Sequence, residues 1–534
     1  MIKKIFCLGL FASILNADVI KKEITLDFLQ NNPRSQTKDF YIWQYLDQNI
    51  NSDEAMLALS EAQRVDNKLF FRFAKKFGHD ETYAVAQCMQ ADTKSLIEQN
   101  DDCIELGLSY SQALSLSYDE LKTIAIKLQE NYPIKSKALE ILNSNLPFVK
   151  LVSTSSEVFF EVFNKTPTNF RYEKLNYRLP QVLIDKIQDK NEFNQTIKLI
   201  VTDTKLKNLQ NSLIGIDDTK LNFQSSFYLA LNVLLNKRDD ELALKYLDNA
   251  SKKAYFKIDK DMVVFWQYLV TKNDELLQSL ASSWDINIYS LYAQEKLNIQ
   301  PQNIDFDTKI ESDITMPVIT QFDWVKILLS LSTVDEEMLN TFENTLSNNE
   351  LPHLVFLTHR YHQYQKSFFI TPYEKYLESN TSNRKSLIYA LARQESGFIP
   401  TSISSSFALG AMQIMPFLVN SLSKEFSEDI FLEDMFNIEI NLKYANKHLD
   451  YLESKLNHPL YVFYAYNGGI GYTNREIIPL FKENLPYQPF MAMELISFDE
   501  TKQYGKKVLA NYYIYNNRIS SEPKPINFLL ETIK

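Results

Sequence analysis

The segment Asp240-Glu-Leu-Ala-Leu-Lys-Tyr-Leu-Asp-Asn-Ala250 has a residue pattern from which the fold class can be predicted. Its apolar and small residues recur at helical spacing and fall on one face; they are Leu242, Ala243, Tyr246, Leu247 and Ala250. Small and large side chains on the same face suit helices that stack in pairs along a solenoid. The segment therefore predicts an amphipathic helix packed against similar neighbours.

Short helices of the same kind are predicted from residue 18 to about residue 300. The clearest examples are the stretch around Leu57–Phe73 and the segments Leu121–Leu128, Ser136–Leu142 and Phe227–Leu235. No strict repeat length relates them, which predicts a superhelix with degenerate repeats. Gly and Pro, the residues of hairpins and tight turns, number only 10 and 17 among 534 residues. Pattern and composition together predict an all-α fold.

The chain is too long for one compact core, and its residue composition changes along its length. Residues 18–300 are predicted to form the helical solenoid. Residues 301–365, which three prolines interrupt, are predicted to form a small helical linker domain. Residues 366–534 are predicted to form a separate C-terminal domain. Six of the ten glycines lie in this last part, which indicates unusual turns or close backbone approaches: Gly397, Gly410, Gly468, Gly469, Gly471 and Gly505.

Residues 1–17 have the pattern of a secretory signal peptide. Lys3 and Lys4 form a basic start, an apolar run follows from Ile5 to Leu15, and Ala17 offers a small residue for cleavage. The apolar run is too short to span a bilayer, and no later run is apolar enough to form a transmembrane helix. We therefore expect a soluble, exported mature protein without an integral membrane segment. A buried N-terminal helix is the alternative interpretation.

Two cysteines, Cys88 and Cys103, remain after removal of the signal peptide. In an oxidising compartment they are predicted to form a disulfide between adjacent helices. Two independent buried thiols are the alternative. No cysteine cluster has the spacing of metal ligands, and no metal site is predicted.

The formal net charge of −11 is a poor match for nucleic acid or an anionic membrane surface, so neither partner is predicted. The six histidines form no HExxH motif and no spacing typical of a nucleophile. The sequence also lacks a Walker loop, a Rossmann fingerprint and an EF-hand loop. No cofactor is predicted.

Glu395 is the first candidate for chemistry in the glycine-rich C-terminal part. Thr381 and Ser382 can cap a helix that runs to Glu395, and Leu387, Leu391 and Glu395 follow at successive i+4 positions. A carboxylate on the apolar face of a helix end is paired, solvated, or held in a cleft with a raised pKa. Spacing alone favours a structural role.

The segments around and after Glu395 change this interpretation. They are Ala392-Arg-Gln-Glu395-Ser-Gly-Phe-Ile-Pro400, Ser402-Ile-Ser404-Ser-Ser406, Ala408-Leu-Gly410-Ala-Met-Gln413-Ile-Met415-Pro416, Ala465-Tyr466-Asn467-Gly-Gly469-Ile-Gly471 and Glu494-Leu-Ile-Ser-Phe498-Asp-Glu500-Thr-Lys-Gln-Tyr504. Together they resemble the catalytic domain of the soluble lytic murein transglycosylases, which has a lysozyme-like fold. The motifs stand in the family's order, and the resemblance covers about residues 366–534. The preceding solenoid and linker resemble the family's ring-like superhelical domain and linker in architecture.

Some positions depart from the family pattern. Phe407 stands where the family usually has Gly, Ala411 replaces a common Leu, Ala445 a common Gly and Ile470 a common Pro. None of these changes removes a polar catalytic group. Phe407 bears on the geometry of the loop after Ser404.

The resemblance implies an enzyme that cleaves the β-1,4 bond between N-acetylmuramic acid and N-acetylglucosamine in peptidoglycan glycan strands, in the periplasm. Only Glu395 falls in a recognisable catalytic position, and a substrate acetamido group can replace a second carboxylate. Glu395 would act as acid and then as base, and the muramyl C6 hydroxyl would close a 1,6-anhydro ring. An apolar surround that includes Met412 and Met415 would raise its pKa.

The resemblance also implies binding roles for other residues. Ser404 is expected near Glu395 or the acetamido group, with a plain loop serine as the alternative. Gln413 and the Met415 backbone are expected to line the sugar subsites. Tyr466 is expected to bond Glu395 or the acetamido oxygen, and Asn467 to fix the turn.

Glu494 and Tyr504 match positions in the family's motif and are expected to contact the substrate or its peptide stem. For Glu494 a structural salt bridge is an equal alternative. Two other functions stay open: a lysozyme-type hydrolase, in which the same Glu delivers water to C1, and a non-catalytic peptidoglycan-binding scaffold. Protein partners are not indicated.

Overall fold

The computed structural model describes residues 19–533 except 79, 307, 309–318, 332–333 and 346–349, so the predicted signal peptide at residues 1–17 lies outside the described residues. The fold is all-α, as predicted. The strands in the described ranges are two residues long: β1 (Val19–Ile20) pairs in parallel with β4 (Ile430–Phe431), and β2 (Ile304–Asp305) with β3 (Ser367–Phe368).

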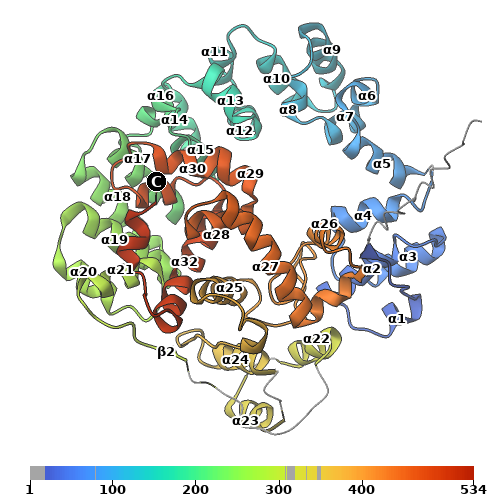
Figure 1. The fold of residues 1–534 in the computed structure, drawn as a ribbon. Helices are drawn as coiled ribbons and strands as arrows, with labels where there is room; N and C mark the ends of the chain where they lie inside the picture. Colours follow the sequence, from blue (N-terminus) through green and yellow to red (C-terminus); the bar gives the residue numbers. More distant parts are fainter. Residues whose placement is uncertain are drawn as a thin grey trace, which may run out of the picture.

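Short helices form an arc that Figure 1 shows in blue, green and yellow-green. They are α1 (Leu26–Gln30), α2 (Gln36–Tyr45), α3 (Ser52–Ser60), α4 (Asn67–Ala74), α5 (Glu81–Gln90), α6 (Thr93–Ile97), α7 (Asp101–Gly107), α8 (Tyr110–Ala113), α9 (Tyr118–Leu128), α10 (Pro133–Leu142), α11 (Pro147–Val152), α12 (Ser156–Lys165), α13 (Thr168–Phe170), α14 (Gln181–Ile187), α15 (Phe193–Val201), α16 (Lys207–Ser212), α17 (Phe223–Asn236), α18 (Asp240–Lys253), α19 (Lys257–Thr271), α20 (Asp274–Ala281) and α21 (Ile288–Lys296).

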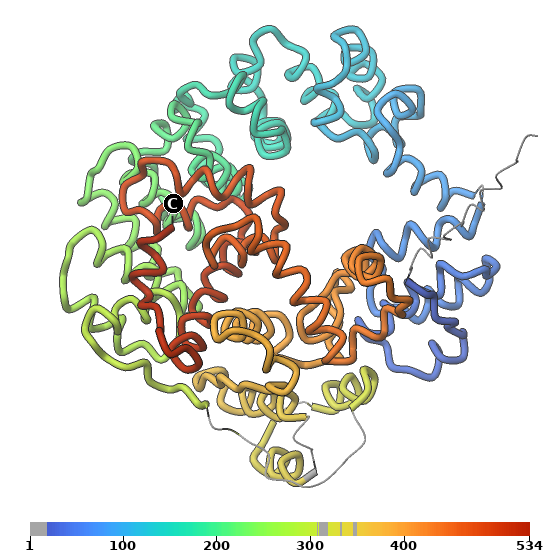
Figure 2. The backbone as a smooth tube through the Cα atoms, in the orientation of Figure 1, coloured from blue at the N-terminus to red at the C-terminus, as the bar shows by residue number. Residues whose placement is uncertain are grey.

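The remaining helices form the linker region and the C-terminal part. They are α22 (Gln321–Ser330), α23 (Glu336–Thr345), α24 (Leu351–Tyr361), α25 (Ser382–Glu395), α26 (Pro416–Phe426), α27 (Ile438–Lys455), α28 (Pro459–Gly468), α29 (Ile470–Tyr472), α30 (Ile478–Lys482), α31 (Phe490–Glu494), α32 (Asp499–Ile519) and α33 (Ile526–Glu531). The arc surrounds much of the C-terminal part, drawn in orange and red in Figures 1 and 2.

Helix α18 confirms the helix predicted from Asp240 to Ala250. The side chain of Asp239 caps its first turn by accepting a hydrogen bond from the backbone N–H of Leu242. Ala243, Tyr246, Leu247 and Ala250 are buried, and α18 packs along α17. The predicted apolar face therefore lies in the core between neighbouring helices.

The linker region has a small core of its own. Trp324, Leu331, Leu339, Leu354 and Leu357 form a cluster separate from the main core, together with Ile399 of the C-terminal part. The division of the chain at residues 300 and 365 stays a prediction.

The first helices of the arc contact a loop near the active site. Gln36 donates a hydrogen bond to the carbonyl of Ile403 (2.7 Å), and Lys68 donates one to the carbonyl of Ser405 (2.7 Å). Figure 1 shows α2 and α4 next to α26, on the opposite side of the C-terminal part from α17–α21. The first helices of the arc are therefore attached to the C-terminal part.

Helices α25, α28 and α32 form the centre of the C-terminal part. Gly505 of α32 lies against the ring of Tyr464 in α28, and a Cβ atom at this position would be 2.0 Å from that ring. Glycine is needed here because any side chain would push the two helices apart. None of the helices in the described ranges is both long and apolar enough to cross a bilayer.

Candidate active site

Glu395 is the last residue of α25, and its side chain is half-buried at the wall of a cleft. The helix begins as predicted, because the Thr381 side chain accepts a hydrogen bond from the backbone N–H of Arg384. It ends at Gly397, whose φ of +64° suits glycine. Ser396 then donates a hydrogen bond to the carbonyl of Ala411 (2.8 Å), which fixes this end against the next loop.

Tyr504 of α32 donates a 2.5 Å hydrogen bond to Oε1 of Glu395. The structure therefore places Tyr504, and not Tyr466, on Glu395, and the expected bond from Tyr466 to the acetamido oxygen of the substrate stays a prediction. The hydroxyl of Tyr466 donates to the carbonyl of Met412 instead, at 2.7 Å. The long contact of α25 with α32 brings Tyr504 to Glu395, whereas Tyr466 at the end of α28 reaches the backbone of the neighbouring loop.

Three influences set the acidity of Glu395. Burial raises the pKa most, the hydrogen bond from Tyr504 lowers it, and the negative charge of Glu500 raises it; together they bring the pKa to about 7. A carboxyl group with this pKa is partly protonated near neutral pH, so it can donate a proton and later accept one.

The cleft has a volume of about 680 Å³ and is lined by residues from five segments of the C-terminal part. Its lining includes six residues that the sequence nominated: Glu395, Ser404, Gln413, Met415, Tyr466 and Asn467. Tyr504 and Glu494 do not line it. Tyr504 lies behind Glu395 and is only 6% exposed, so it contacts the carboxylate and is not among the cleft-lining residues.

Ser404 shapes the loop of the cleft wall. Its hydroxyl oxygen accepts hydrogen bonds from the backbone N–H groups of Ala408 (3.0 Å) and Ser406 (3.2 Å). No hydrogen bond joins it to Glu395 in the described part of the chain, although both residues line the cleft, and the expected contact with the acetamido group stays a prediction. This serine stabilises a tight turn at the edge of the cleft.

Gln413 is held rigidly in the opposite part of the same loop. Its side-chain amide donates to the carbonyl of Gly410 at 2.8 Å and to that of Ser402 at 3.3 Å. The backbone of Gln413 has a φ of +50°, an uncommon conformation for a residue with a side chain. These hydrogen bonds of the side-chain amide compensate for the backbone strain, and Gln413 remains among the residues that line the cleft.

Asn467 connects the cleft to the start of α32. Its amide donates to Glu500 at 3.1 Å, and its carbonyl oxygen accepts a hydrogen bond from Thr501 at 2.7 Å. This geometry agrees with the expected role of fixing the turn after α28.

Glu494 is removed from the cleft, which corrects the prediction that it contacts substrate. It is 2% exposed and forms a buried ion pair with Lys506, whose Nζ lies 3.0 Å from Oε2. Tyr289 of α21 also donates to Glu494 at 2.7 Å. The carboxylate thus joins the C-terminal part to the arc, as the salt-bridge alternative describes.

Glu500 is the residue that the sequence reasoning missed. It lines the cleft as a second carboxylate, so Glu395 is not the only one there. The spacing held a signal, because Glu500 and Tyr504 are four residues apart and share a helix face. The cleft also receives ring side chains that were not nominated: Phe417, His448 and Tyr451.

Phe407, the departure from glycine in the family pattern, has a φ of +65°. Its ring is 3% exposed and lies 5.8 Å from that of Phe40 and 5.5 Å from that of Trp43, both in α2. The ammonium group of Lys68 lies 4.5 Å from the ring centre. The loop therefore keeps a glycine-like backbone while the ring packs against the first helices.

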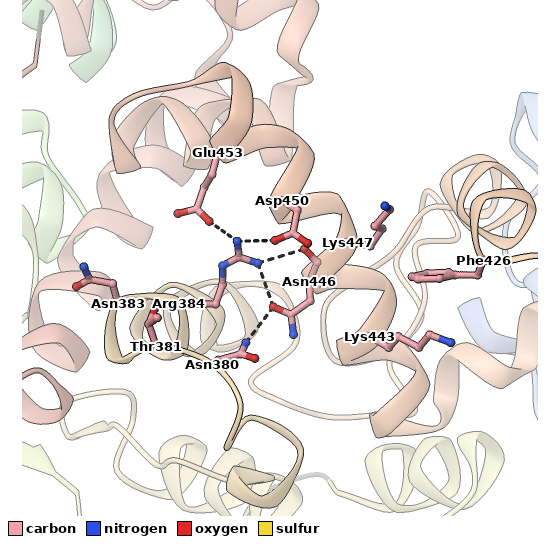
Figure 3. Close-up of a pocket in the computed structure, with 10 residues that line it drawn as sticks. All are labelled: Asn380, Thr381, Asn383, Arg384, Phe426, Lys443, Asn446, Lys447, Asp450 and Glu453. Carbon is pink, nitrogen blue, oxygen red and sulfur yellow. Dashed lines mark hydrogen bonds and ion pairs between the residues drawn. The ribbon is translucent and has the colours of Figure 1, made fainter.

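A second hollow lies on another face of α27, and its side chains pair with one another. Figure 3 shows Arg384 directed toward Asp450, Glu453 and Asn446. Its Nη2 atom lies 2.7 Å from a carboxylate oxygen of Asp450. The carboxylates of Asp450 and Glu453 therefore neutralise the central cation of this hollow.

Cys88 and Cys103 are joined by a disulfide in the structure. The bond links α5 to α7, far along the arc from Glu395.

Comparisons with known proteins agree with this geometry. Residues 372–478 match the family described as "Transglycosylase SLT domain". The fold is similar to that of an inactive mutant of the lytic transglycosylase Slt from Pseudomonas aeruginosa, with a TM-score of 0.51 and 17% identity over 94% of this chain and 89% of that chain. It is also similar to the 70 kDa soluble lytic transglycosylase Slt70 from Escherichia coli, with a TM-score of 0.50 and 16% identity over 95% and 90% of the two chains. The predicted resemblance is confirmed.

Proposed function

We propose that this chain, a peptidoglycan lytic transglycosylase with an SLT domain at residues 372–478, cleaves the bond between N-acetylmuramic acid and N-acetylglucosamine and leaves a 1,6-anhydro end. Glu395 is the acid and then the base. The observation that carries the proposal is the half-buried Glu395 carboxyl group, with a pKa of about 7, in the wall of a cleft.

The proposed reaction begins with a proton transfer. Glu395 protonates the glycosidic oxygen, the bond from C1 of the muramyl residue to that oxygen breaks, and the N-acetylglucosamine end leaves as an alcohol. The 2-acetamido oxygen stabilises the positive charge at C1. The C6 hydroxyl of the same muramyl residue then attacks C1 and returns its proton to Glu395. The carboxyl group is regenerated, and no water is consumed.

The cleft residues suit this course. Gln413, Met415 and Asn467 line the cleft and are proposed to contact the sugar rings, with Ser404 keeping the loop in place. Tyr504 is proposed to hold the Glu395 carboxylate in one orientation. The lining combines aromatic and amide groups, which suits a polar ring with apolar faces.

Hydrolysis is the second candidate, because Glu500 lines the same cleft. A second carboxylate can activate a water molecule for attack on C1. The side chain of Glu500 accepts a hydrogen bond from Asn467 and is exposed to solvent.

Mass spectrometry of digested peptidoglycan separates the two reactions. We expect anhydro-muropeptides from the unmodified enzyme and none from Glu395→Gln, which removes the proton donor and keeps the side-chain shape. Glu476→Gln, a change at an exposed residue outside the cleft, is the matched control and is expected to cleave normally. Reducing-end muramyl products would establish hydrolysis, and full activity of Glu395→Gln would refute the proposed acid.

Export to the periplasm is proposed from the first 17 residues and from the location of the substrate. Expression of the full chain with subcellular fractionation, followed by N-terminal sequencing, tests it. The expected mature protein begins at Asp18, and an uncleaved cytoplasmic product would contradict export.

A further inference from the structure

A cavity of about 430 Å³ lies where the arc, the linker region and the catalytic helices meet. The arc contributes the segments before α19 and before α21, the linker region contributes the end of α24 and β3, and the catalytic part contributes α25 and α32. These elements lie side by side in Figures 1 and 2. None of the described residues that line this cavity also lines the catalytic cleft, so it is a distinct site.

Arg393 is a fixed cation in the cavity wall. Its Nε donates to the carbonyl of Phe368 at 2.9 Å, its Nη1 donates to Asn511 at 2.6 Å, and the guanidinium stacks over Phe369. No carboxylate within the described ranges forms an ion pair with it at 4.0 Å or less. Lys507, the next cation along the wall, is exposed and likewise has no ion pair among the described residues.

Asp285 is the acidic residue of the same lining. It accepts a hydrogen bond from the amide of Asn287 at 2.9 Å and is half-buried. Asp285 is close enough to Arg393 and to Lys507 for electrostatic interaction with both. Within the part of the chain that the structure describes, however, these three groups form no ion pair with one another. Opposite charges therefore face one cavity without neutralising each other.

Aromatic side chains complete the lining. Phe256 is 64% exposed and Trp284 is half-buried on the arc side, while Tyr364 is 56% exposed on the linker side. Flat apolar surfaces between separated charges suit a ligand with a short apolar body and a charge at each end.

We propose that this cavity binds a short peptide with free amino and carboxylate ends. The carboxylate pairs with Arg393 and Lys507, the ammonium group pairs with Asp285, and the peptide body lies against Phe256 and Trp284. The volume is at the small end of ligand cavities, which suits two or three residues. The two other lysines of the lining, Lys257 and Lys506, are paired with Asp261 and Glu494, so the charges left for a ligand are of both signs, which favours a ligand that carries both.

Isothermal titration calorimetry on the full mature chain tests the proposal with alanyl-alanine as the probe. The free dipeptide is expected to bind, and N-acetyl-alanyl-alanine and alanyl-alaninamide, which each lack one charge, are expected to bind about tenfold more weakly. Asp285→Asn and Lys507→Ala are each expected to weaken binding by a similar factor. Lys260→Ala, an exposed lysine of α19 outside the cavity lining, is the matched control and should bind normally. Circular dichroism checks that each variant is folded.

Several results would overturn the proposal. They are absence of dipeptide binding, equal binding of the capped dipeptides, and equal binding of inorganic phosphate. Displacement of the dipeptide by triacetylchitotriose, a sugar probe for the catalytic cleft, would place the peptide in that cleft instead. Binding is also measured on the Glu395→Gln variant. It is expected to persist there, so failure of the cleavage mechanism and failure of the peptide site are distinguishable.

Discussion

Tyr504 and Glu395 are 109 positions apart in the chain, yet the tyrosine hydroxyl donates a 2.5 Å hydrogen bond to the glutamate. The contact depends on α25 and α32 packing along each other. A donor to a carboxylate favours its ionised form, whereas burial favours the protonated form. The pKa of Glu395 therefore results from opposing effects, of which the contributions of Tyr504 and Glu500 can be removed separately.

Tyr504→Phe removes the donor and is expected to raise the pKa of Glu395. The proton donor must be protonated, so activity falls as pH rises through this pKa. The basic limb of the pH profile of kcat/KM should therefore move to higher pH, by up to about one unit. Tyr466→Phe is the matched control, because that hydroxyl bonds the Met412 carbonyl, and its basic limb should stay in place. A downward shift in Tyr504→Phe would show that the hydroxyl does not stabilise the carboxylate.

Glu500→Gln should have the opposite effect. It removes a negative charge that raises the pKa of Glu395, so the basic limb should move to lower pH. Glu500 is exposed, and added salt should therefore reduce the difference between variant and unmodified enzyme. The measurement is the same pH profile at low and high ionic strength. A shift that does not depend on salt would indicate a change in structure.

The buried pair of Glu494 and Lys506 is expected to stabilise the fold strongly. Lys506→Met leaves the Glu494 carboxylate buried without its cation, which costs about 3–5 kcal/mol. The double variant with Glu494→Gln should be more stable than Lys506→Met alone. Lys220→Met, which breaks the exposed pair with Asp189, is the control and should cost less than about 1 kcal/mol. Thermal and urea unfolding measure the differences; equal losses from the buried and exposed pairs would contradict the assignment.

Phe407 offers a test of backbone conformation against side-chain packing. Phe407→Ala loses the ring contacts with α2 and keeps a residue with a Cβ atom at a φ of +65°. Phe407→Gly loses the same contacts but relieves the backbone strain, which is about 1 kcal/mol. The glycine variant should therefore be at least as stable as the alanine variant. At Ala243, inside α18, the usual order should hold, with glycine less stable than alanine. Unfolding midpoints of these variants provide the comparison.

The helical fold could be predicted because its signals are local. The apolar face of α18 and the Thr381 cap of α25 each depend on residues within a few positions of one another. Glu395 could be nominated because the motifs around and after it stand together in the order of a known family.

The partner of Glu395 could not be predicted in the same way. Two tyrosines, Tyr466 and Tyr504, stood in suitable motifs, and the choice between them depends on how α25, α28 and α32 pack. Glu494 also stood in a motif that suited the cleft. In the structure it lies in the core, where Lys506 of α32 forms an ion pair with it. The cavity lined by Asp285 and Arg393 could not be predicted from the sequence, because these residues belong to distant segments that only the folded chain brings together.

A stack of helices has two ends, and an uncovered end leaves apolar side chains without neighbours. Here the loop that holds Ser404 and Phe407 covers the first end, through Phe40 and Trp43. Lys68 is synthesised 337 residues before its partner Ser405, so the first helices lack this contact until most of the chain has been made. The loop that finally covers them also forms a wall of the cleft. Completion of the scaffold and assembly of the cleft wall therefore depend on the same loop.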